Sequence, residues 1–480
     1  MKKKKDKSVK KKRGQNRQIL QMTYLFVLMF CVLIGYYGYF LVAESEEVVS
    51  NPYNSARIDQ QAERILRGNI LSSEGDILAM TQTDEEGNES RYYPYGSLFA
   101  HTVGYSTRGT TGIESVANEQ LLTCSLTSME QIYNELMGGK NEGNSVVTTL
   151  NLNLQQVLYE AMAGYTGAAV VLEPSTGRVL AMVSTPDFDP NTINETYEVI
   201  IADESNTNLL NKAAQGRYSP GSVFKLLTLL EYIRENPSDW QAFSYHCDGS
   251  IEVDGVSIAC SGGSAHGNVD VQRALELSCN GAFIEMGLSL DVDSFAETCE
   301  TAGFNQRVDF ELPVSSSSFS LERSDTDFEI AQTVFGQGET LVTPLNMTMI
   351  VSAIANEGVM CSPYIIERVQ DSNGSTIASY ESPSSVRIMT EEEAAIISGM
   401  MEGVVNNGTA GSVKSDFYQA AAKTGSAQTG ADIETNAWFV GFAPADNPAV
   451  AIAVVLEEGG SGGTNAGPIA KAVFDACLIP

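Results

Sequence analysis

Histidine is scarce in this sequence of 480 residues, which contains only His101, His246 and His266. A hydrolase of the Ser-His-Asp type therefore has few places to find its general base, and His101 lies far from the other two along the chain. A serine enzyme that uses lysine as its base needs no histidine and stays open. We expect His266, in the segment SAHGNV, to have a structural role.

Positive charge is scarce outside the N-terminal tail. Ten of the 29 Lys and Arg residues lie within residues 1–17, whereas 60 Asp and Glu residues give the whole chain a formal net charge of -31. An acidic body gains nothing from approaching a polyanion, so we expect no binding to nucleic acid. No internal repeat is present, and the basic tail is the only biased segment.

One uncharged run, QILQMTYLFVLMFCVLIGYYGYFLVA at residues 18–43, is long enough to cross a bilayer. The basic tail before it and the acidic ESEE after it predict a single-pass membrane protein with a cytoplasmic N-terminus and an extracytoplasmic body. A cleaved signal peptide is the alternative, but the run is longer than a typical apolar signal region.

The eight cysteines are scattered, and Cys31 lies inside the predicted span, so we expect most of them to be free and buried. Cys247 and Cys260 flank the hairpin-like segment DGSIEVDGVSIA, which leaves a disulfide between them open. The spacing of His246 relative to these two cysteines matches no common zinc template. No metal site is therefore expected.

A Gly-rich break, GGKNEGNSVV, divides the body near residues 138–147. Residues 44–147 combine a helix-like segment at 57–68 with short extended pieces, which predicts a small mixed α/β domain. Residues 148–480 predict a larger α+β domain in which helices cover a sheet built from distant segments.

The larger domain has strand patterns at both ends and helix patterns between and after them. A capping box at Thr390 and Glu393 predicts the start of one helix. The expected strands are the pair in GAAVVLEPSTGRVLAMVSTP and those in QAAAKTGSAQ, NAWFVGFAP and PAVAIAVVLEEG, and the expected late helices are TEEEAAIISGMMEGVV and GPIAKAVFDACL.

The segment GRYSPGSVFKLLTLLEY, residues 216–232, runs from a turn into an apolar helix that carries a single lysine. Ser222 and Lys225 lie three residues apart and therefore share a face at the N-terminal end of that helix. A lysine in apolar surroundings is neutral often enough to take a proton from serine. Taken alone, the pattern is better explained by a Ser222 that caps the helix and a Lys225 that reaches solvent.

Two further motifs change that interpretation. ALELSCNGAF contains Ser278 and Asn280, and AAAKTGSAQ contains the Lys-Thr-Gly-Ser run that begins at Lys423. In this order the three motifs resemble the S-x-x-K, S-x-N and K-T-G set of penicillin-binding proteins and class A β-lactamases. EPSTGRVLAMVSTPDFDPN and FGQGETLVTPLNMTMIVSAIANEG are similar to class B penicillin-binding proteins, and RGNILSSEGDILA resembles their short PbpA-type members.

The resemblance implies an antiparallel sheet covered by helices, preceded by one transmembrane helix and a small non-catalytic domain of the pedestal or dimerisation type. It implies that Ser222 is the acylated nucleophile and that Lys225 activates it. Ser278 is then expected to relay protons to the leaving amine. Asn280 is expected to orient Lys225 and the substrate, and Lys423 to tune the proton network.

The same resemblance assigns the binding of substrate to the K-T-G strand. Thr424 and Ser426 are expected to contact a carboxylate, and Gly425 to let the substrate backbone lie close. The backbone N–H groups of Ser222 and Ser426 are the expected oxyanion hole. Cys279, inside the S-x-N motif, is expected to point away from the cleft and to be buried and inert.

The implied activity is that of a serine-type peptidoglycan D,D-transpeptidase, which links stem peptides through an acyl-enzyme, is inhibited by β-lactams and needs no cofactor. About 100 residues between span and catalytic domain are too few for a glycan polymerase, so the resemblance implies a SEDS-type glycosyltransferase as partner. A D,D-carboxypeptidase, a β-lactamase or β-lactam sensor, and a non-catalytic scaffold of cell-wall assembly remain alternatives.

Overall fold

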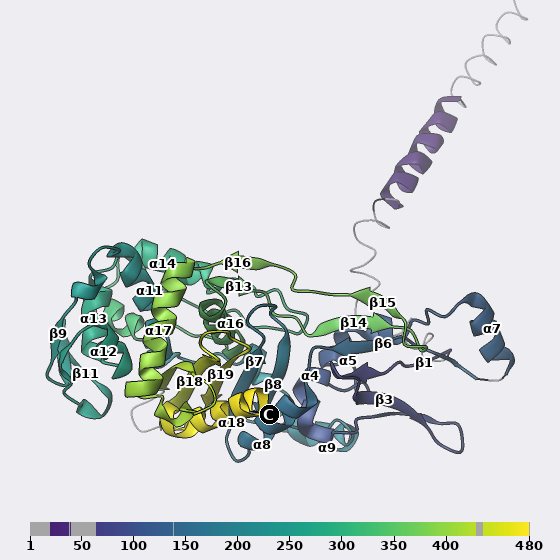
Figure 1. The fold of residues 1–480 in the computed structure, drawn as a ribbon. Helices are drawn as coiled ribbons and strands as arrows, with labels where there is room; N and C mark the ends of the chain where they lie inside the picture. The colour runs from purple at the N-terminus through teal and green to yellow at the C-terminus, as the bar shows by residue number, and fades with distance from the viewer. Residues whose placement is uncertain (1–19, 38, 40–63, 138, 429–434, 480) are drawn as a thin grey trace, which may run out of the picture. The chain divides into compact units, whose positions relative to one another are not determined.

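The computed structural model describes residues 20–37, 39, 64–137, 139–428 and 435–479 (Figure 1). The chain forms two compact units, Met1–Gln61 and Ala62–Pro480. In the first unit the structure describes a helix, Leu20–Tyr37, of 18 residues with none of its residues buried, and it is long and apolar enough to cross a membrane. This helix fits the predicted single-pass anchor. The basic tail and the segment that follows the span lie outside the described residues.

The core of the second unit is a five-stranded sheet in the order β17-β18-β19-β7-β8 (Figure 1). All neighbouring strands are antiparallel, which confirms the predicted sheet. Every residue of β18 and β19 is buried, so both faces of the sheet are covered. The strands are β7 (Gly167–Leu172), β8 (Val179–Thr185), β17 (Ala421–Ala427), β18 (Asn436–Ala443) and β19 (Val450–Leu456).

Helices from both ends of the larger region cover this sheet (Figure 1). Helices α8 and α18 pack against each other and against β8 and β19, whereas α16 and α17 pack against β19 and β17. The predicted capping box at Thr390 and Glu393 is present at the start of α17. The covering helices are α8 (Leu152–Ala161), α16 (Pro344–Ala355), α17 (Glu391–Asn407) and α18 (Gly467–Leu478).

A mainly helical region lies beside the sheet and carries two of the three predicted motifs. Its helices are α11 (Lys225–Glu235), α12 (Val271–Glu276), α13 (Asn280–Leu288), α14 (Val292–Thr301) and α15 (Asp327–Val334). Further short elements are α9 (Ile193–Ala202), α10 (Lys212–Gln215), β9 (Tyr245–Cys247), β12 (Gly267–Val269), β13 (Val359–Cys361) and β16 (Ser385–Arg387).

The predicted hairpin in DGSIEVDGVSIA is confirmed as β10 (Ser250–Val253) and β11 (Val256–Ala259). Asp254 and Gly255 form its two-residue turn with φ of 52° and 77°, as a turn that matches the twist of the strands requires. Cys247 and Cys260 nevertheless remain free thiols, so the disulfide left open by the sequence is not formed.

The N-terminal region, residues 64–148, contributes to a second sheet in the order β15-β14-β6-β2-β3-β4. Its strands are β2 (Ile70–Leu71), β3 (Ile77–Thr83), β4 (Glu89–Tyr92), β6 (Ser145–Thr148), β14 (Ile366–Gln370) and β15 (Thr376–Ser379). Strands β14 and β15 lie beyond residue 147, where the sequence predicted the domain boundary. That boundary stays a prediction. The helix-like segment at 57–68 is extended where it is described, since β1 (Ile65–Leu66) pairs with β5 (Asn141–Glu142).

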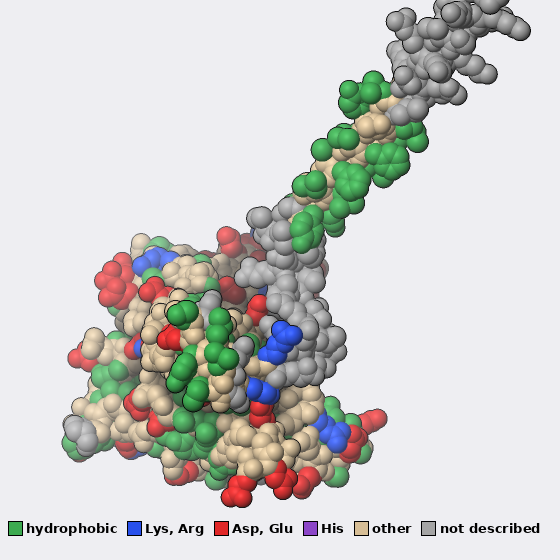
Figure 2. Space-filling model, turned by 90° about the vertical axis from the view of Figure 1, so that its right-hand side faces the viewer, with side chains coloured by type: hydrophobic (Ala, Val, Ile, Leu, Met, Phe, Trp, Pro, Cys, Tyr) green, Lys and Arg blue, Asp and Glu red, His purple; other side chains and the backbone are tan. Residues whose placement is uncertain are grey.

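Helix α7 (Ser128–Leu136) of the N-terminal region has an exposed apolar face. Its apolar residues follow helical spacing, and exposed apolar side chains gather on the face of the molecule shown in Figure 2. They are Met129, Ile132, Tyr133 and Leu136, with exposed fractions of 82%, 55%, 63% and 80%. The other helices of the region are α4 (Ala100–Val103), α5 (Gly112–Val116) and α6 (Asn118–Leu121).

Candidate active site

The three predicted motifs meet at one cleft of about 1010 Å³. The cleft lies between strand β17, the hairpin β10–β11 and the N-terminal ends of α11 and α13. Residues from all three motifs line it, namely Ser222, Ser278, Asn280, Thr424, Gly425 and Ser426. Lys225 and Lys423 lie beneath this lining with no exposed surface. The structure therefore brings together every site residue that the sequence predicted.

Ser222 lies in a short 3₁₀ turn, Gly221–Val223, immediately before α11. The turn is held by Gly221, which has φ of 56° and donates its N–H to the Gly336 carbonyl at 2.8 Å. A β-carbon on Gly336 would lie 2.1 Å from the Gly221 carbonyl oxygen, so no larger residue fits there. Lys225 is the first residue of α11, which places the serine at the helix N-terminus as predicted.

Lys225 is buried and donates three hydrogen bonds to the S-x-N motif. Its Nζ lies 2.8 Å from the Ser278 carbonyl oxygen, 3.3 Å from Ser278 Oγ and 2.7 Å from Asn280 Oδ1. Burial lowers the pKa of Lys225 to about 7, against the opposing effect of Cys279 and Cys260. A large share of Lys225 is therefore neutral near pH 7, as a general base must be.

Ser278 and Asn280 lie on the turn between α12 and α13, where Ser278 adopts φ of 54°. A positive φ is uncommon for a residue with a β-carbon and often marks a functional position. Asn280 Nδ2 donates to the Ala259 carbonyl at 2.9 Å, which ties the turn to the end of β11. Cys279 is fully buried and, unlike its two neighbours, does not line the cleft.

Lys423 lies in β17 and connects the K-T-G strand to the same serine. Its Nζ donates to Ser278 Oγ at 2.9 Å and to the Thr424 carbonyl at 2.7 Å. Burial and the charge of Lys225 lower the pKa of Lys423 well below its usual value. The Ser278 hydroxyl oxygen thus accepts from both lysines, which leaves its own proton available to a third group.

Ser222 forms no hydrogen bond with Lys225, its expected base, in this structure. Among the residues that the structure describes, none hydrogen-bonds to the Ser222 hydroxyl, and the described bonds of Lys225 all go to the S-x-N motif. Catalytic hydrogen bonds are often long without substrate and tighten in the complex. Ser222 is partly exposed at the floor of the cleft, so a substrate carbonyl has access to it.

Gly425 is required by the packing of β17 against the turn that carries Ser222. A β-carbon at Gly425 would lie 3.2 Å from the Pro220 carbonyl oxygen and 3.1 Å from Trp438 Cβ. Trp438 in turn donates its Nε1–H to the Ser219 carbonyl at 3.0 Å. The protein's own packing therefore already requires a glycine at this position, whether or not a substrate lies against it.

Sequence reasoning missed Thr409, which also lines the cleft. Its Oγ1 lies 2.6 Å from Thr424 Oγ1, and it follows α17 in a loop that carries no recognisable motif. Only folding brings residues 409 and 424 together, so the sequence contains no local signal for this pair. The Ser426 hydroxyl donates to the Gly460 carbonyl at 3.2 Å.

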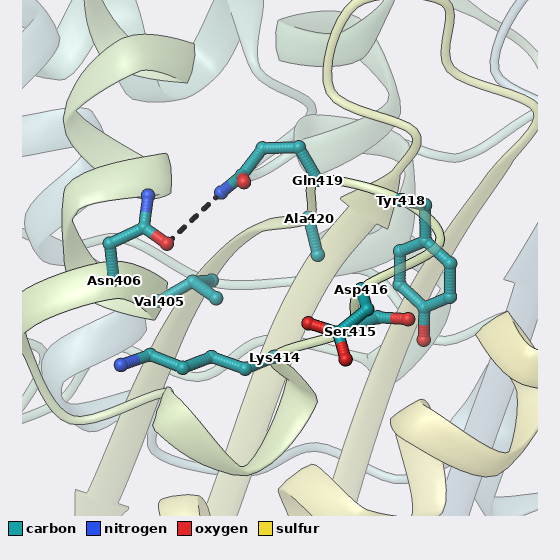
Figure 3. A pocket seen from close by; sticks show the side chains of 8 residues that line it. All are labelled: Val405, Asn406, Lys414, Ser415, Asp416, Tyr418, Gln419 and Ala420. Atoms are coloured by element: carbon teal, nitrogen blue, oxygen red, sulfur yellow. Dashed lines mark hydrogen bonds between the residues drawn. The ribbon is translucent and has the colours of Figure 1, made fainter.

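A smaller hollow of about 240 Å³ lies between the end of α17 and the segment before β17 (Figure 3). It is lined by Val405, Asn406, Lys414, Ser415, Asp416, Tyr418, Gln419 and Ala420, and Gln419 Nε2 donates to Asn406 Oδ1 at 3.3 Å. None of the predicted site residues faces it. The larger cleft is therefore the candidate active site.

Two family models match the chain. Residues 167–475 match the penicillin binding protein transpeptidase domain, and residues 67–146 match the penicillin binding protein A dimerisation domain. The two matched segments contain the five-stranded sheet with its three motifs and most of the N-terminal region, respectively.

Named relatives agree with these matches. The peptidoglycan D,D-transpeptidase PbpA of Mycolicibacterium smegmatis is 28% identical over 467 residues, which are 88% of this chain and 92% of the relative. The structure of penicillin-binding protein A from M. tuberculosis as a ceftriaxone acyl-enzyme complex is similar with a TM-score of 0.81 and 27% identity, covering 88% of this chain and 100% of the other.

A further solved structure is the D,D-transpeptidase domain of a peptidoglycan glycosyltransferase from Eggerthella lenta. It has a TM-score of 0.78 and 30% identity and covers 86% of this chain and 98% of the other. The similarity therefore extends over the N-terminal region as well as over the part with the three motifs.

Proposed function

This chain belongs to the penicillin-binding protein transpeptidase family, and we propose that it cross-links peptidoglycan stem peptides through an acyl-enzyme on Ser222. It is a peptidoglycan D,D-transpeptidase that β-lactams inhibit. One observation carries the assignment of roles: two fully buried lysines converge on Ser278 beneath a cleft whose floor is Ser222.

The proposed reaction transfers an acyl group in two steps. Ser222 Oγ attacks the carbonyl carbon of the D-Ala–D-Ala bond, the C–N bond breaks, and D-alanine leaves with a proton on its nitrogen. An amine of a neighbouring stem then attacks the ester, a new amide forms, and Ser222 regains its proton. A β-lactam follows the first step only, because its cleaved amide stays attached to the acyl group.

Lys225 acts as the base that takes the Ser222 proton. Its pKa of about 7 supports this role, because the neutral amine is present in quantity near neutral pH. A hydrogen bond of 2.7 Å from Lys225 Nζ to Asn280 Oδ1 holds the amine at the S-x-N turn. Asn280 also offers its amide to the substrate's peptide bond.

Ser278 delivers the proton to the leaving nitrogen. It lies 3.3 Å from Lys225 Nζ and 2.9 Å from Lys423 Nζ, so its hydroxyl can give up one proton and receive another from either side. Lys423 tunes this chain of proton transfers, since its own pKa is also lowered by burial. We expect the loss of either lysine to slow acylation more than it weakens binding.

The K-T-G strand binds the substrate. Thr424 and Ser426 lie on the cleft wall, where their hydroxyls can contact the terminal carboxylate of the stem peptide or of a β-lactam. The backbone N–H groups of Ser222 and Ser426 form the oxyanion hole. Each such donor typically contributes about 3 kcal/mol to stabilisation of the transition state.

The helix Leu20–Tyr37 anchors the chain with residues 1–17 in the cytoplasm and the catalytic region outside. Ten basic residues before the helix support this orientation. Alkaline phosphatase, which is active only outside the cytoplasm, should be active when fused after residue 480 and inactive when fused ahead of residue 1 of the full chain. The opposite pattern would reverse the orientation.

A SEDS-type glycosyltransferase supplies the glycan strands, and the similarity to the PbpA transpeptidases supports this partner. The exposed apolar face of α7 supports a docking role for the N-terminal region. Replacing Ile132 and Leu136 by Asp should abolish copurification with the polymerase and leave penicillin acylation unchanged. Unchanged copurification would exclude α7 as the contact.

The decisive test is the intact mass of the full-length chain in detergent after reaction with penicillin, compared with Ser222→Ala. We expect one stable adduct on the native chain and none on the variant. Supplying a stem-peptide donor with an amine acceptor should then give a cross-linked product. Release of D-alanine without cross-links would favour a D,D-carboxypeptidase.

The remaining alternatives give distinct results in the same experiment. Rapid appearance of hydrolysed penicillin without a lasting adduct would indicate a β-lactamase. A lasting adduct without any D-alanine release from stem peptides would indicate a β-lactam sensor. Neither adduct nor hydrolysis would favour a non-catalytic scaffold.

A further inference from the structure

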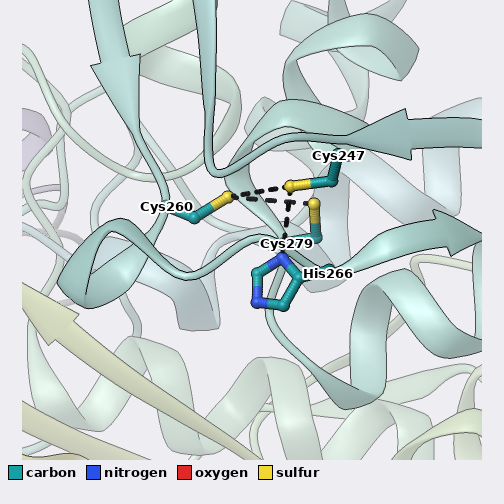
Figure 4. Close-up of side chains that lie close together, drawn as sticks. All are labelled: Cys247, Cys260, His266 and Cys279. Carbon is teal, nitrogen blue, oxygen red and sulfur yellow. Dashed lines mark hydrogen bonds between the residues drawn. The ribbon is translucent and has the colours of Figure 1, made fainter.

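Behind the S-x-N motif lies a cluster of four side chains, Cys247, Cys260, His266 and Cys279 (Figure 4). Their three sulfur atoms and one imidazole nitrogen all lie within 4.8 Å of one another. The three cysteines are at most 2% exposed, whereas His266 is partly exposed. Each residue comes from a different place: the end of β9, the end of β11, the loop before β12 and the start of α13.

Three of the six distances within the cluster match the edges of a tetrahedral zinc site. Cys247 Sγ lies 3.6 Å from Cys260 Sγ and 3.4 Å from His266 Nδ1, and Cys260 Sγ lies 3.9 Å from Cys279 Sγ. With Zn–S bonds of about 2.3 Å and a Zn–N bond of about 2.0 Å, a tetrahedron has S···S edges of about 3.8 Å and S···N edges of about 3.5 Å. Packed thiols have similar pairwise spacings, but packing alone does not require four ligand atoms to face one centre.

The N-terminus of α13 provides a second, independent observation. Cys279 is the N-cap residue of α13, and the Ala282 N–H donates to Cys279 Sγ at 3.5 Å. Backbone N–H groups that point at sulfur stabilise the thiolate, which is the form that binds metal.

We propose that Cys247, Cys260, Cys279 and the Nδ1 atom of His266 bind one Zn²⁺ ion. Three thiolates and one imidazole suit zinc by ligand softness and by geometry. Binding displaces three thiol protons to solvent and leaves the site with one net negative charge. All four positions are filled by protein, so the ion is structural and takes no part in acyl transfer.

The ion would fix the geometry of the active site from behind. Cys279 lies between Ser278 and Asn280, so a bond from zinc to its sulfur holds the turn in which Ser278 has φ of 54°. Cys260 follows the hairpin β10–β11, which forms one wall of the cleft. Zinc thus joins this wall to the S-x-N turn.

From the sequence, His246 with Cys247 and Cys260 matched no zinc template, and no metal site was expected. His246 is exposed and its Nδ1 pairs with Asn268, because neighbouring residues in β9 point to opposite faces and only Cys247 faces inward. The correct ligand, His266, reaches the cluster from the next strand, since β12 pairs with β9. Cys279, expected to be inert, becomes a ligand. The spacing in the sequence could not reveal a site shared by four segments.

The test is the metal content of the full-length chain, measured by elemental mass spectrometry. The chain is purified in detergent without a metal-affinity step. We expect about one zinc per chain. Cys260→Ser and His266→Ala should each lose the zinc on dialysis, whereas His246→Ala and Cys361→Ser, as matched controls, should keep it. Equal zinc content in His266→Ala and His246→Ala would overturn the proposal.

A second measurement covers variants that fail to fold. The native chain, stripped by a chelator, is titrated with Co²⁺ alone and then with Zn²⁺ alone. We expect cobalt to give the charge-transfer band of thiolate ligation and the visible bands of a tetrahedral site. We also expect penicillin acylation to fall about 10-fold without metal and to recover with Zn²⁺.

The metal readouts do not depend on the proposed function. A stripped chain that reacts with penicillin but binds neither ion would overturn the zinc site and leave the transpeptidase intact. A native chain that contains no metal and is lighter by two hydrogens than the fully reduced chain would show a disulfide in place of the zinc site.

Discussion

At the scale of single residues, the active site depends on two lysine side chains that are buried away from solvent. Lys225 and Lys423 have no exposed surface, and both have lowered pKa values because burial disfavours their charged forms. Their hydrogen bonds go to serine, asparagine and backbone oxygens rather than to carboxylates. Among the described residues, no carboxylate forms an ion pair with either lysine and stabilises its charged form. The neutral amines are therefore available as proton acceptors.

The first prediction concerns the pH dependence of acylation. With the neutral form of Lys225 as the proposed base and a pKa of about 7, the rate of penicillin acylation should rise with pH through about 7 and then level off. Lys225→Arg should lower the rate at least about 100-fold at every pH, because a guanidinium does not lose its proton. A fluorescent penicillin and rapid quenching measure both effects.

The control for this prediction is Lys471→Arg, which changes a partly exposed lysine of α18 that is remote from the cleft. It should acylate as fast as the native chain. A rate that is flat between pH 6 and pH 8 in the native chain would contradict a base with a pKa of about 7.

The second prediction concerns a buried carboxylate in the N-terminal region. Glu114 is fully buried and accepts from Arg67 at 2.7 Å and from Arg91 at 2.6 Å. Burial would raise its pKa, but the two guanidinium groups outweigh burial and lower it below 4.5. Glu114→Gln should cost about 3–5 kcal/mol at pH 7, because it leaves two largely buried cations without a counter-charge.

The pH dependence of this cost has a definite sign. A lowered carboxyl pKa gives stability that is present above about pH 4.5 and is lost as the pH falls through the folded-state value. The difference in thermal unfolding between the native chain and Glu114→Gln should therefore shrink in acid. A difference that grows below pH 4 would contradict the ion pairs.

At the scale of elements, helix α17 connects the S-x-N motif to the sheet. It packs against α12, which precedes Ser278, and against β17, which carries the K-T-G motif. Two glycines of α17 lie in different surroundings. Gly399 has no neighbouring atom within 4 Å of the position of a β-carbon, whereas at Gly403 that carbon would lie 2.1 Å from Gln272 Nε2.

The third prediction uses these glycines as a matched pair. Gly399→Ala should stabilise the chain by about 0.5–1 kcal/mol, because alanine favours an exposed helix position over glycine. Gly403→Ala should destabilise it by about 1 kcal/mol, because Gln272 must give up its bonds to the Met400 carbonyl and Glu276. Thermal unfolding with circular dichroism would measure both, and equal stabilisation by the two substitutions would contradict close packing of α12 on α17.

At the scale of the whole molecule, the six-stranded sheet joins distant parts of the chain. Strand β6 pairs with β2 in parallel and with β14 in antiparallel orientation. Its Val146 and Val147 have no exposed surface. The N-terminal region is thus completed by residues that follow more than 200 positions later.

The fourth prediction follows from this sheet. A fragment of residues 62–147 lacks β14 and β15, so the edge of β6 would be unpaired and its valines exposed. The fragment should aggregate or unfold without a sharp transition, whereas residues 62–480 should stay folded and react with penicillin as fast as the full chain. Calorimetry and acylation of both fragments check this, and a sharp transition in the short fragment would show that the region folds alone.

Much of the fold was predictable because its signals are local. The five strands of the central sheet and the capped helix α17 are each encoded by a continuous buried or periodic segment. The extended backbone at Ile65–Leu66 was missed because pairing with a strand near residue 141 decides it. That pairing partner leaves no trace in the pattern of residues 57–68.

For this protein, the sequence by itself determined the three motifs and the roles they imply, because each motif depends on residue types at short fixed spacing. The tertiary structure decided the convergence of the lysines on Ser278, the contact of Thr409 with Thr424 and the placement of His266 beside three buried cysteines. These contacts join residues far apart in the chain. Their positions follow from how whole sheets and helices pack, which no local pattern contains.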